Sequence, residues 1–458
     1  MPRFYVSAAH KSSGKTTVAI GLAAALAGRG LAVQPFKKGP DYIDPLWLGR
    51  AAGRPCYNLD FNTQSARDIR DLMEGRGADA SLSLIEGNKG LFDGLDLEGR
   101  DSNDALARLL AAPVVLVIDC VGMTRGIAPL LLGYRDFAPD LPFAGVILNK
   151  VGGPRHESKL RGAVERYTDI PVLGAVPRDE SLVIDERHLG LVPANETGAA
   201  EAHIAPLAKA MRQSVDLTAL YMAAEEAPDM ALPAVPQSPP PAPDLRIGYS
   251  RDAAFGFYYT DDLEAFAAAG AELVPVDTLA DRALPDGLDG LFLGGGFPET
   301  HMGALAANRP LLDDLAAAVE AGLPVHAECG GLMLLGRTLT WGGDTVEMAG
   351  ALPLHTTMHP RPEGRGLVRL SPTADAPWAP VPTGDSFSAH EFHYSAVSRL
   401  EAELPHAWTV ERGRGIDGAR DGLIHRNTIA SYSHFRATSA IPWVARFVDF
   451  VRRRKAGA

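Results

Sequence analysis

A proline-rich segment near the middle of the chain limits the folds that this sequence can adopt. Between Glu225 and Asp244 the sequence reads EEAPDMALPAVPQSPPPAPD. Proline fixes φ and has no amide hydrogen, so such a run joins neither a helix interior nor a central strand and forms a semi-rigid, extended linker. We therefore expect two domains, residues 1–225 and 245–458, connected by a linker at residues 226–244.

The composition of the chain indicates which kinds of partner and which cellular compartment to expect. The 458 residues carry a formal net charge of −12, which disfavours nucleic acid or an anionic membrane as a partner because both would repel the chain. Its three cysteines, Cys56, Cys120 and Cys329, are far apart and lack metal-ligand spacing. No signal-peptide pattern or membrane-length apolar run is present. We expect a cytoplasmic protein that binds small molecules; its oligomeric state stays open, with a homodimer among the alternatives.

Short apolar runs alternate with helical patterns in both halves of the chain. Strands that are apolar throughout and separated by helices predict parallel sheets covered on both faces. The expected strands are residues 4–8, 32–36, 82–86, 114–119, 145–148 and 172–175 in the first half, and 246–249, 272–275, 290–293, 324–327 and 428–431 in the second. Both halves are therefore predicted to be doubly wound α/β domains.

A loop rich in small and basic residues follows the first expected strand. From Ala9 to Thr17 it reads AHKSSGKTT, which matches the phosphate-binding pattern G-x-x-x-x-G-K-[ST] except that Ala9 replaces the first glycine. Backbone amides would hold phosphates, Lys15 would add a positive charge and the Thr16 hydroxyl could bind Mg²⁺. A basic helix cap is the alternative, but the order of strand, loop and helix favours a nucleotide. The expected nucleotide-binding residues are Lys11, Ser12, Ser13, Gly14, Lys15, Thr16 and Thr17, with Asn149 as a weaker candidate for a contact to the base.

Two acidic residues follow expected strands in this half. Asp41 lies in the block KKGPDYIDP, and Glu86 ends the run SLIE. Ligands of parallel sheets collect at the carboxyl ends of strands, so both acids could share a Mg²⁺ site with Thr16. Each acid could instead be a turn or cap residue.

One cysteine in the second half has the surroundings of a nucleophile. Cys329 lies between the apolar run LPVHA and a pair of glycines that begins with Gly330, and a helical run follows. A thiol on such a strand-to-helix turn points toward substrate, and the helix N-terminus lowers the cost of negative charge. Flanking glycines permit a strained turn. A buried structural cysteine is the alternative reading.

A glycine loop and a histidine could complete this second site. Gly294, Gly295 and Gly296 follow an expected strand and could turn amides toward an oxyanion. His434, in the run SYSHF after the last strand, is a candidate base for Cys329. Other histidines compete for that role, and residue chemistry alone does not choose among them: His326, His390, His393 and His425.

Taken together, these blocks resemble the cobyrinic acid a,c-diamide synthase family over nearly the whole chain. The matching stretches are KGPDYIDP, IEG with GLFDG, GVILN, PRDE, RHLGLVP, RDAAF with FYY, GGGFPE, AECGG, HEFHYS and SYSH. The resemblance implies an N-terminal P-loop domain that binds ATP and ligates amides, joined to a C-terminal class I-type glutamine amidotransferase domain. It also places Tyr42 and Asp44 in the substrate region.

The resemblance further implies a mechanism. Cys329, with His434 as base, would release ammonia from glutamine, and the glycine loop with Gly330 would stabilise the oxyanion. ATP and Mg²⁺ would convert acetate groups of a tetrapyrrole into acyl phosphates that ammonia displaces in cobalamin biosynthesis. The alternatives are amidation of siroheme or sirohydrochlorin acetates, a partner-regulated ATPase with an inactive amidotransferase module, and a ligase of the biotin-precursor type.

Two departures from related sequences bear on the mechanism. The loop has Ala9-His10-Lys11 where the family usually has Gly-Thr-Ser, so Lys11 adds a second cation near the phosphates. Amidotransferases of this class often carry a glutamate two residues after the histidine, and here that position is Arg436. We therefore expect a Cys-His dyad or an orienting acid from elsewhere in the chain.

Overall fold

The computed structural model describes residues 1–187, 190–196, 200–230 and 239–457. Residues 231–238 of the expected linker, and two residues of the RHLGLVP block, lie outside this described part. Two compact units make up the chain: Met1–Phe61 with Ser65–Pro236, and Asn62–Gln64 with Gln237–Ala458. Each unit has its own sheet and its own core, and each is described separately below.

The first unit is built on a seven-stranded sheet in which every pairing is parallel. Its strand order is β3-β2-β4-β1-β5-β6-β7. The strands are β1 (Arg3–Ala8), β2 (Val33–Lys38), β3 (Tyr57–Leu59), β4 (Leu82–Glu86), β5 (Val114–Asp119), β6 (Phe143–Val151) and β7 (Val172–Pro177). Their residues are almost all buried, as expected for strands covered on both faces.

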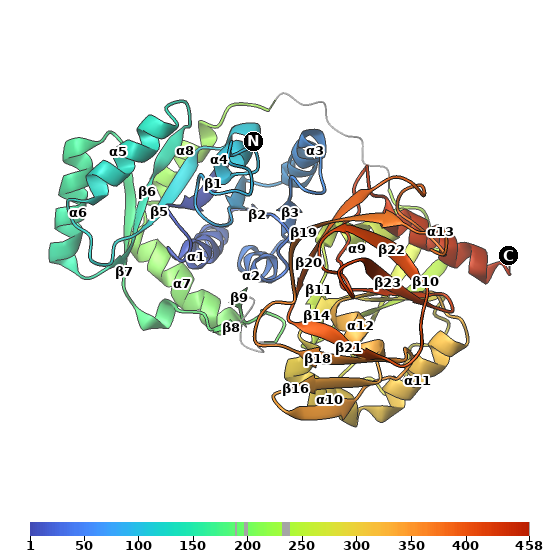
Figure 1. Cartoon of the computed structure of the whole chain (residues 1–458). Coiled ribbons are helices and arrows are strands. Elements are labelled where there is room, and N and C mark those ends of the chain that lie inside the picture. Colours follow the sequence, from blue (N-terminus) through green and yellow to red (C-terminus); the bar gives the residue numbers. More distant parts are fainter. Residues whose placement is uncertain (188–189, 197–199, 231–238, 458) are drawn as a thin grey trace. The chain divides into compact units, whose positions relative to one another are not determined.

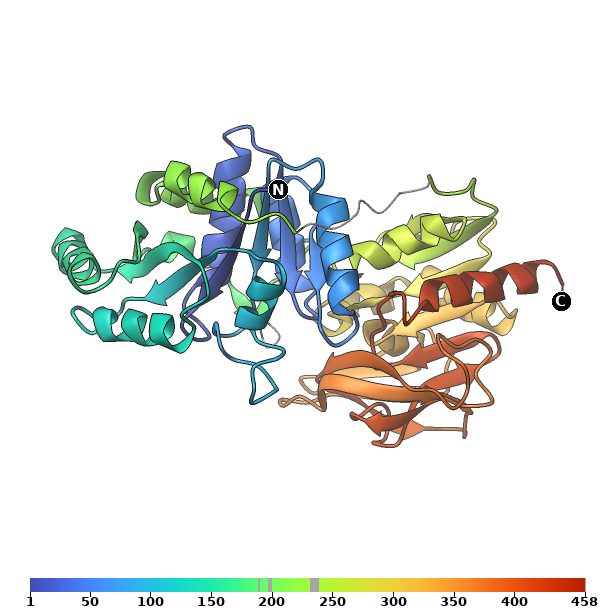
Figure 2. The same cartoon turned by 90° about the horizontal axis from the view of Figure 1, so that it is seen from above.

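Helices cover both faces of this sheet (Figures 1 and 2). The helices are α1 (Lys15–Ala27), α2 (Ile43–Ala52), α3 (Ala66–Gly77), α4 (Asn103–Leu109), α5 (Ile127–Phe137), α6 (Pro154–Tyr167), α7 (Ala200–Ser214) and α8 (Leu217–Glu225). Helix α1 packs against α2 and α7, while α5 packs against α6. A 3₁₀ turn (Glu180–Leu182) and the short pair β8 (Glu186–Arg187) and β9 (Gly190–Leu191) follow β7. The loops after β1, β2 and β4 meet at one edge of the sheet, which is where ligands of such folds bind.

The second unit contains a nine-stranded mixed sheet of order β12-β10-β13-β15-β24-β23-β22-β19-β20. The first five strands in that order are parallel: β12 (Ala271–Val276), β10 (Leu245–Ser250), β13 (Gly290–Leu293), β15 (Val325–Glu328) and β24 (Thr428–Ser431). The other four pair antiparallel: β23 (Arg420–His425), β22 (His406–Arg412), β19 (Gly364–Pro372) and β20 (Phe387–His393). The carboxyl ends of β13, β15 and β24 therefore lie side by side.

Smaller elements complete this unit (Figure 1). The helices are α9 (Thr260–Ala268), α10 (Met302–Ala307), α11 (Arg309–Glu320), α12 (Gly330–Leu335) and α13 (Trp443–Lys455), and a 3₁₀ turn spans Pro298–His301. A four-stranded sheet contains β17 (Asp344–Glu347), β16 (Thr338–Trp341), β18 (Leu354–Met358) and β21 (Ser395–Leu400), and β11 (Phe255–Phe257) pairs with β14 (Gly295–Gly296).

The structure confirms the predicted fold class, with one addition. All the parallel strands expected from the sequence are present in both units, most within one or two residues of the expected ends. The antiparallel strands β19, β20, β22 and β23, between residues 364 and 425, were not predicted as part of the second sheet. They join it because β23 forms a hairpin with β24 and so extends the parallel edge without a crossover helix. Within the described part of the chain, none of the helices combines the length and the hydropathy that crossing a membrane requires.

Candidate active sites

The loop between β1 and α1 has the shape that phosphate binding requires. Ser12 and Gly14 have φ of 67° and 83°, so the backbone reverses sharply before the helix begins at Lys15. A side chain at Gly14 would collide with the Asn149 amide, so only glycine fits there. The Ser13 hydroxyl donates to the carbonyl of His10 at 2.8 Å and holds the turn closed.

Two side chains at the end of β6 hold this loop. Asn149 Nδ2 donates to the Ser13 carbonyl at 2.8 Å, and Lys150 Nζ donates to the Ser12 carbonyl at 3.1 Å. The structure thus places Asn149, our weaker candidate for a base contact, against the phosphate loop itself. Lys11 and Ser12 are exposed, and Thr17 is half-buried in the first turn of α1.

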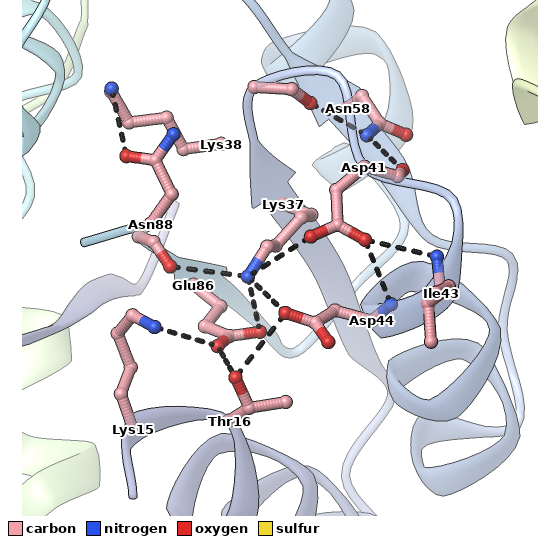
Figure 3. Close-up of polar contacts among 12 residues, drawn as sticks. Lys15, Thr16, Lys37, Lys38, Asp41, Ile43, Asp44, Asn58, Glu86 and Asn88 are labelled. Atoms are coloured by element: carbon pink, nitrogen blue, oxygen red, sulfur yellow. Dashed lines mark hydrogen bonds and ion pairs between the residues drawn. The ribbon is translucent and has the colours of Figure 1, made fainter. Parts of the chain in front are cut away.

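A compact charged cluster lies beside the start of α1 (Figure 3). The Thr16 hydroxyl lies 2.5 Å from Glu86 Oε1 and 3.3 Å from Asp44 Oδ2. Lys15 Nζ lies 3.5 Å from the same Glu86 oxygen. These residues come from α1, α2 and β4, so three elements that are separate in the sequence build one site.

Lys37, at the end of β2, is the centre of this cluster (Figure 3). Its ammonium lies 2.5 Å from Asp44 Oδ2 and 3.2 Å from Glu86 Oε2, and it donates to the Gly87 carbonyl at 3.3 Å. Burial alone would lower the pKa of Lys37, but Asp44 and Glu86 outweigh burial and raise it. Burial also opposes ionisation of Asp44, yet Lys37 and Lys15 lower its pKa overall. These pKa shifts favour the charged forms of Lys37 and Asp44, and the cluster interleaves lysines with carboxylates.

Asp41, the predicted Mg²⁺ ligand, lies at the edge of the cluster and contacts the start of α2. Its Oδ1 accepts hydrogen bonds from the amides of Ile43 and Asp44, both at 3.0 Å, and so caps the first turn of α2. Its Oδ2 is 3.9 Å from Lys37 Nζ. Burial and the neighbouring Asp44 raise the pKa of Asp41. Asn58 Nδ2 fixes the loop that carries Asp41 by donating to the Gly39 and Asp41 carbonyls at 2.8 and 2.7 Å (Figure 3).

The cluster has the donor chemistry that suits Mg²⁺. Thr16, Asp44 and Glu86 offer hard oxygen atoms, and Glu86 Oε2 is buried with the Lys37 ammonium as its ion-pair partner. No group of three or more His, Cys, Asp or Glu side chains arranged to hold a metal occurs in the described residues. An ion here would complete its shell with phosphate oxygens and water, as Mg²⁺ at nucleotide sites usually does. Asp44, which the resemblance placed in the substrate region, lies closer to Thr16 than the proposed ligand Asp41 does; Tyr42, the other substrate-region residue, is buried just before α2.

In the second unit, Cys329 forms a strained turn between β15 and α12. Its φ of 46° and ψ of −96° are unusual for a residue other than glycine. From the sequence we expected the flanking glycines to permit the strained turn. In the structure the strained backbone is that of Cys329 itself. Gly330 and Gly331 are required for space: a side chain at Gly331 would collide with the Leu293 carbonyl, and one at Gly330 would lie 3.2 Å from the Gly296 amide nitrogen.

The glycine loop borders both the cysteine and the histidine. Gly295 lies against the His434 ring, because a side chain there would approach His434 Cε1 to 2.6 Å. Gly296 faces Gly330, the residue after Cys329. The Gly294 amide already donates to the Tyr258 hydroxyl at 3.0 Å. The Gly294 amide is therefore engaged, and Gly296 is the loop residue whose amide nitrogen lies near the residue after Cys329.

His434 follows the carboxyl end of β24, and contacts of both its ring and its backbone hold it in place. Its Nδ1 lies 3.2 Å from Glu328 Oε2, and its backbone pairs with that of His390 through hydrogen bonds of 2.8 and 3.2 Å. The His390 ring stacks on the His434 ring with centroids 5.0 Å apart. Burial raises the pKa of the Cys329 thiol, with a further contribution from Glu299, so a base is needed to remove its proton.

The competing histidines have other partners. His326 Nε2 contacts Glu328, His393 Nδ1 contacts the Ser395 carbonyl at 2.7 Å, and His425 Nε2 contacts Glu320 at 2.5 Å. Burial and the neighbouring His434 lower the pKa of His390 well below its usual value. Of these histidines, His434 is the one whose ring borders the glycine loop next to Cys329 in the described structure.

Sequence reasoning missed the roles of two residues that it had quoted. Lys37 was part of the KKGPDYIDP block, and Glu328 was part of AECGG, but neither was given a task. A charged residue at the end of an otherwise apolar strand is an available signal for both. In β15 the spacing of His326 and Glu328, two residues apart, also predicts that they share one face of the strand.

Both halves of the chain match family models. Residues 6–192 match the CobQ/CobB/MinD/ParA nucleotide binding domain, and residues 246–440 match the CobB/CobQ-like glutamine amidotransferase domain. The fold and the two sites therefore define a class of protein in which a nucleotide-binding domain is joined to a glutamine amidotransferase domain.

Relatives that align over the whole chain narrow this class to one family. The chain is 47% identical to the cobyrinate a,c-diamide synthase of Magnetococcus marinus, over 99% of this chain and 98% of the relative. It is 37% identical to the enzyme of the same name from Methanosarcina barkeri (99% and 96%) and 35% identical to that from Listeria monocytogenes (99% and 100%). The chain belongs to the cobyrinate a,c-diamide synthase family, as its motifs predicted.

Proposed function

We propose that this protein uses ATP and glutamine to amidate the a and c acetate groups of cobyrinic acid or its metal-free analogue, hydrogenobyrinic acid. The observation that carries the proposal is the presence of two chemically different sites in a chain whose full-length relatives are named cobyrinate a,c-diamide synthase. One site offers a phosphate loop beside a cluster of paired lysines and carboxylates, and the other a strained cysteine and a histidine that border the same glycine loop, with the histidine held by a carboxylate.

The second unit, residues 245–458, would supply ammonia. His434 takes the thiol proton of Cys329, and the sulfur attacks the side-chain amide carbon of glutamine. Amides of the glycine loop stabilise the oxyanion. The protonated His434 then gives its proton to the departing ammonia, and water releases glutamate from the thioester with His434 again as base.

The first unit, residues 1–225, would activate the carboxylate. A substrate carboxylate oxygen attacks the γ-phosphorus of ATP, ADP leaves, and an acyl phosphate forms. Ammonia attacks the carbonyl carbon, inorganic phosphate leaves, and the amide remains. Lys15 and the amides of residues 11–16 hold the phosphates, and Thr16, Asp44 and Glu86 would hold Mg²⁺. When bound, Mg²⁺ supplies positive charge that stabilises the transferring phosphoryl group.

Mass spectrometry of the products tests this proposal. The protein is incubated with ATP, Mg²⁺ and glutamine, in parallel with cobyrinic acid, hydrogenobyrinic acid and siroheme. Two carboxylate-to-amide mass changes on a corrinoid are expected. Amidation of siroheme alone would keep the mechanism but replace the substrate, and ATP hydrolysis without amidation of any of the three would contradict the proposal.

Exchange of the nitrogen source tests the division of labour. Cys329→Ser should abolish glutamine-dependent amidation but leave turnover with ammonium salts near that of the wild type, because only the nucleophile of the glutaminase is lost. Glutamine-dependent turnover that survived Cys329→Ser would remove Cys329 from the mechanism.

A further inference from the structure

In many amidotransferases of this class, the residue two positions after the catalytic histidine is a glutamate that orients the histidine. In this chain that position is an arginine, which cannot do so. Arg436, two residues after His434, donates to Asp261 Oδ2 through Nε at 3.2 Å and Nη2 at 2.8 Å. Its guanidinium also lies over the Tyr259 ring, 4.9 Å from the centroid. Arg436 is therefore a structural cation, and an orienting acid for His434 must come from another part of the chain.

Glu328, the residue immediately before Cys329, makes the contacts that this task requires. Its Oε2 lies 3.2 Å from His434 Nδ1, and its Oε1 accepts a hydrogen bond of 2.9 Å from the amide of Phe435. The carboxylate thus holds both the ring of His434 and the backbone that follows it. Glu328 reaches this position because β15 and β24 are parallel neighbours in which Glu328 pairs with Ser431.

A second histidine supports the same carboxylate. His326 Nε2 lies 3.0 Å from Glu328 Oε1, and His326 is fully buried among aromatic rings, including those of Trp443 and Phe435. His326 Nδ1 is buried without a hydrogen-bond partner, so a proton there would be left unsatisfied. His326 therefore donates to Glu328 through Nε2.

The charge of Glu328 is stable in this environment. Burial opposes ionisation, but the hydrogen bonds from His326 and His434 prevail and lower the pKa of Glu328 to about 2. An ionised carboxylate can only accept, which fixes the proton of neutral His434 on Nδ1. The lone pair is then on Nε2, where it can take the thiol proton.

Other buried carboxylates nearby serve other partners. Asp261 pairs with Arg436, and Asp262 accepts from the Ala437 amide and the Trp443 indole. Asp421 accepts from the amides of Tyr432 and Ser433, both at 3.0 Å, and so shapes the loop before His434.

We propose that Glu328 is the positioning residue of the glutaminase site, a carboxylate next to the nucleophile in sequence that sets the tautomer and orientation of His434. This inference rests on the proposed glutamine hydrolysis and adds a residue to it. His326 acts behind Glu328 as a buried donor. In this hydrogen-bonded series of His326, Glu328 and His434, Glu328 takes the place of the glutamate of the usual Cys-His-Glu arrangement.

The test replaces the carboxylate without changing its size. In the full-length protein, Glu328→Gln puts an NH₂ group where one carboxylate oxygen accepted, so His434 loses the fixed tautomer. We expect kcat for glutamine hydrolysis to fall roughly 10²-fold or more, with KM for glutamine within about threefold of the wild type. Ammonia-dependent amidation should stay within about twofold, because the synthetase site is untouched.

Two further variants separate positioning from general damage. Glu391→Gln is the matched control, since Glu391 is equally buried in the same unit and accepts from the amides of Arg414 and Gly415. It should leave kcat for glutamine nearly unchanged. Glu328→Asp keeps the charge one methylene further back, and it should recover about tenfold of the kcat lost in Glu328→Gln.

Each result has a defined reading. Glutamine hydrolysis by Glu328→Gln within about threefold of the wild type would overturn the inference, as would equal losses in Glu328→Gln, Glu328→Asp and Glu391→Gln, because charge and position would then not matter. If Glu328→Gln also loses ammonia-dependent amidation, the comparison of kcat for glutamine between Glu328→Asp and Glu391→Gln decides. A lower kcat in Glu328→Asp supports the inference, and equal values overturn it. If Cys329→Ser keeps glutamine-dependent turnover, the proposed function fails and this inference, which rests on it, falls with it. If Cys329→Ser loses that turnover while Glu328→Gln keeps it, this inference alone fails.

Discussion

The two sites of this chain solve the same topological problem with opposite electrostatics. Both lie at the carboxyl ends of parallel strands, where loops from several strands meet. The first places two carboxylates within hydrogen-bonding reach of one threonine and pairs them with two lysines, whereas the second buries a thiol and a histidine held by a carboxylate among glycines and apolar side chains. A site that moves phosphoryl groups needs fixed charge, and a site that opens an amide needs a nucleophile whose charge appears only during reaction.

The difference also appears in how each site is held. The phosphate loop, which follows β1, is held from outside by Asn149 and Lys150 near the end of β6, two strands away in the sheet. The cysteine turn carries its own strain at Cys329, and the residue next to it, Glu328, holds the histidine. Changes in the first site should therefore act through charge and metal, and changes in the second through geometry.

The largest effect should come from Lys15→Ala. Loss of the ammonium at the phosphate loop should lower amidation about 10³-fold with glutamine and with ammonia alike, because carboxylate activation precedes both. Comparison with Cys329→Ser, measured with both nitrogen sources, sharpens the contrast between the sites. Lys11→Ala, an exposed cation of the same loop, serves as the control and should cost less than about tenfold. Near-normal turnover of Lys15→Ala would refute the phosphate-loop assignment.

A second prediction separates the two aspartates after β2. Asp44→Asn should raise the Mg²⁺ concentration for half-maximal turnover at least about tenfold, because Asp44 lies next to Thr16 and Glu86. Asp41→Asn should shift it by less than about threefold, since Asp41 caps α2. Mg²⁺ titrations of both variants check the ranking. The reverse order would return Asp41 to the metal site, where the sequence had placed it.

Lys37→Met tests the idea that the first site works by fixed charge. Lys37 neutralises the carboxylates that would bind the metal, so its removal should tighten Mn²⁺ binding about tenfold in the absence of nucleotide. Electron paramagnetic resonance of free Mn²⁺ measures this directly. Amidation should fall all the same, because the cluster loses a cation near the reacting phosphate. Mn²⁺ binding no tighter than in the wild type would show that Lys37 does not compete with the metal.

The last prediction concerns the free energy of unfolding and distinguishes the second site. The pKa of Glu328 is depressed to about 2 from 4.5, so its contribution is complete above about pH 4.5 and is lost as the pH falls toward 2. A shift of this size corresponds to about 3 kcal/mol at neutral pH. Denaturant unfolding of the full-length wild type and Glu328→Gln should therefore show a difference at pH 6 that shrinks by pH 3. A gap that stayed constant would mean that the carboxylate charge contributes nothing to stability.

Much of the architecture could be predicted from the sequence. The apolar strands separated by helices predicted both parallel sheets, and AHKSSGKTT and the ECGG turn predicted where the loops of the two sites lie. The antiparallel strands β19, β20, β22 and β23 were missed, because a strand that pairs antiparallel with its neighbour carries no βαβ pattern.

The sequence by itself determined the local features. These are the glycine before Lys15, which can adopt a positive φ, the order of strand, turn and helix around Cys329, and the apolar pattern of the strands. Tertiary structure alone decided the partners of charged side chains. Asp44 and not Asp41 faces Thr16, Lys37 lies between two carboxylates, and Glu328 reaches His434 across two parallel strands. The reason is physical: local preferences depend on neighbours in the chain, whereas the balance of charges in a buried site depends on which strand ends the fold brings together.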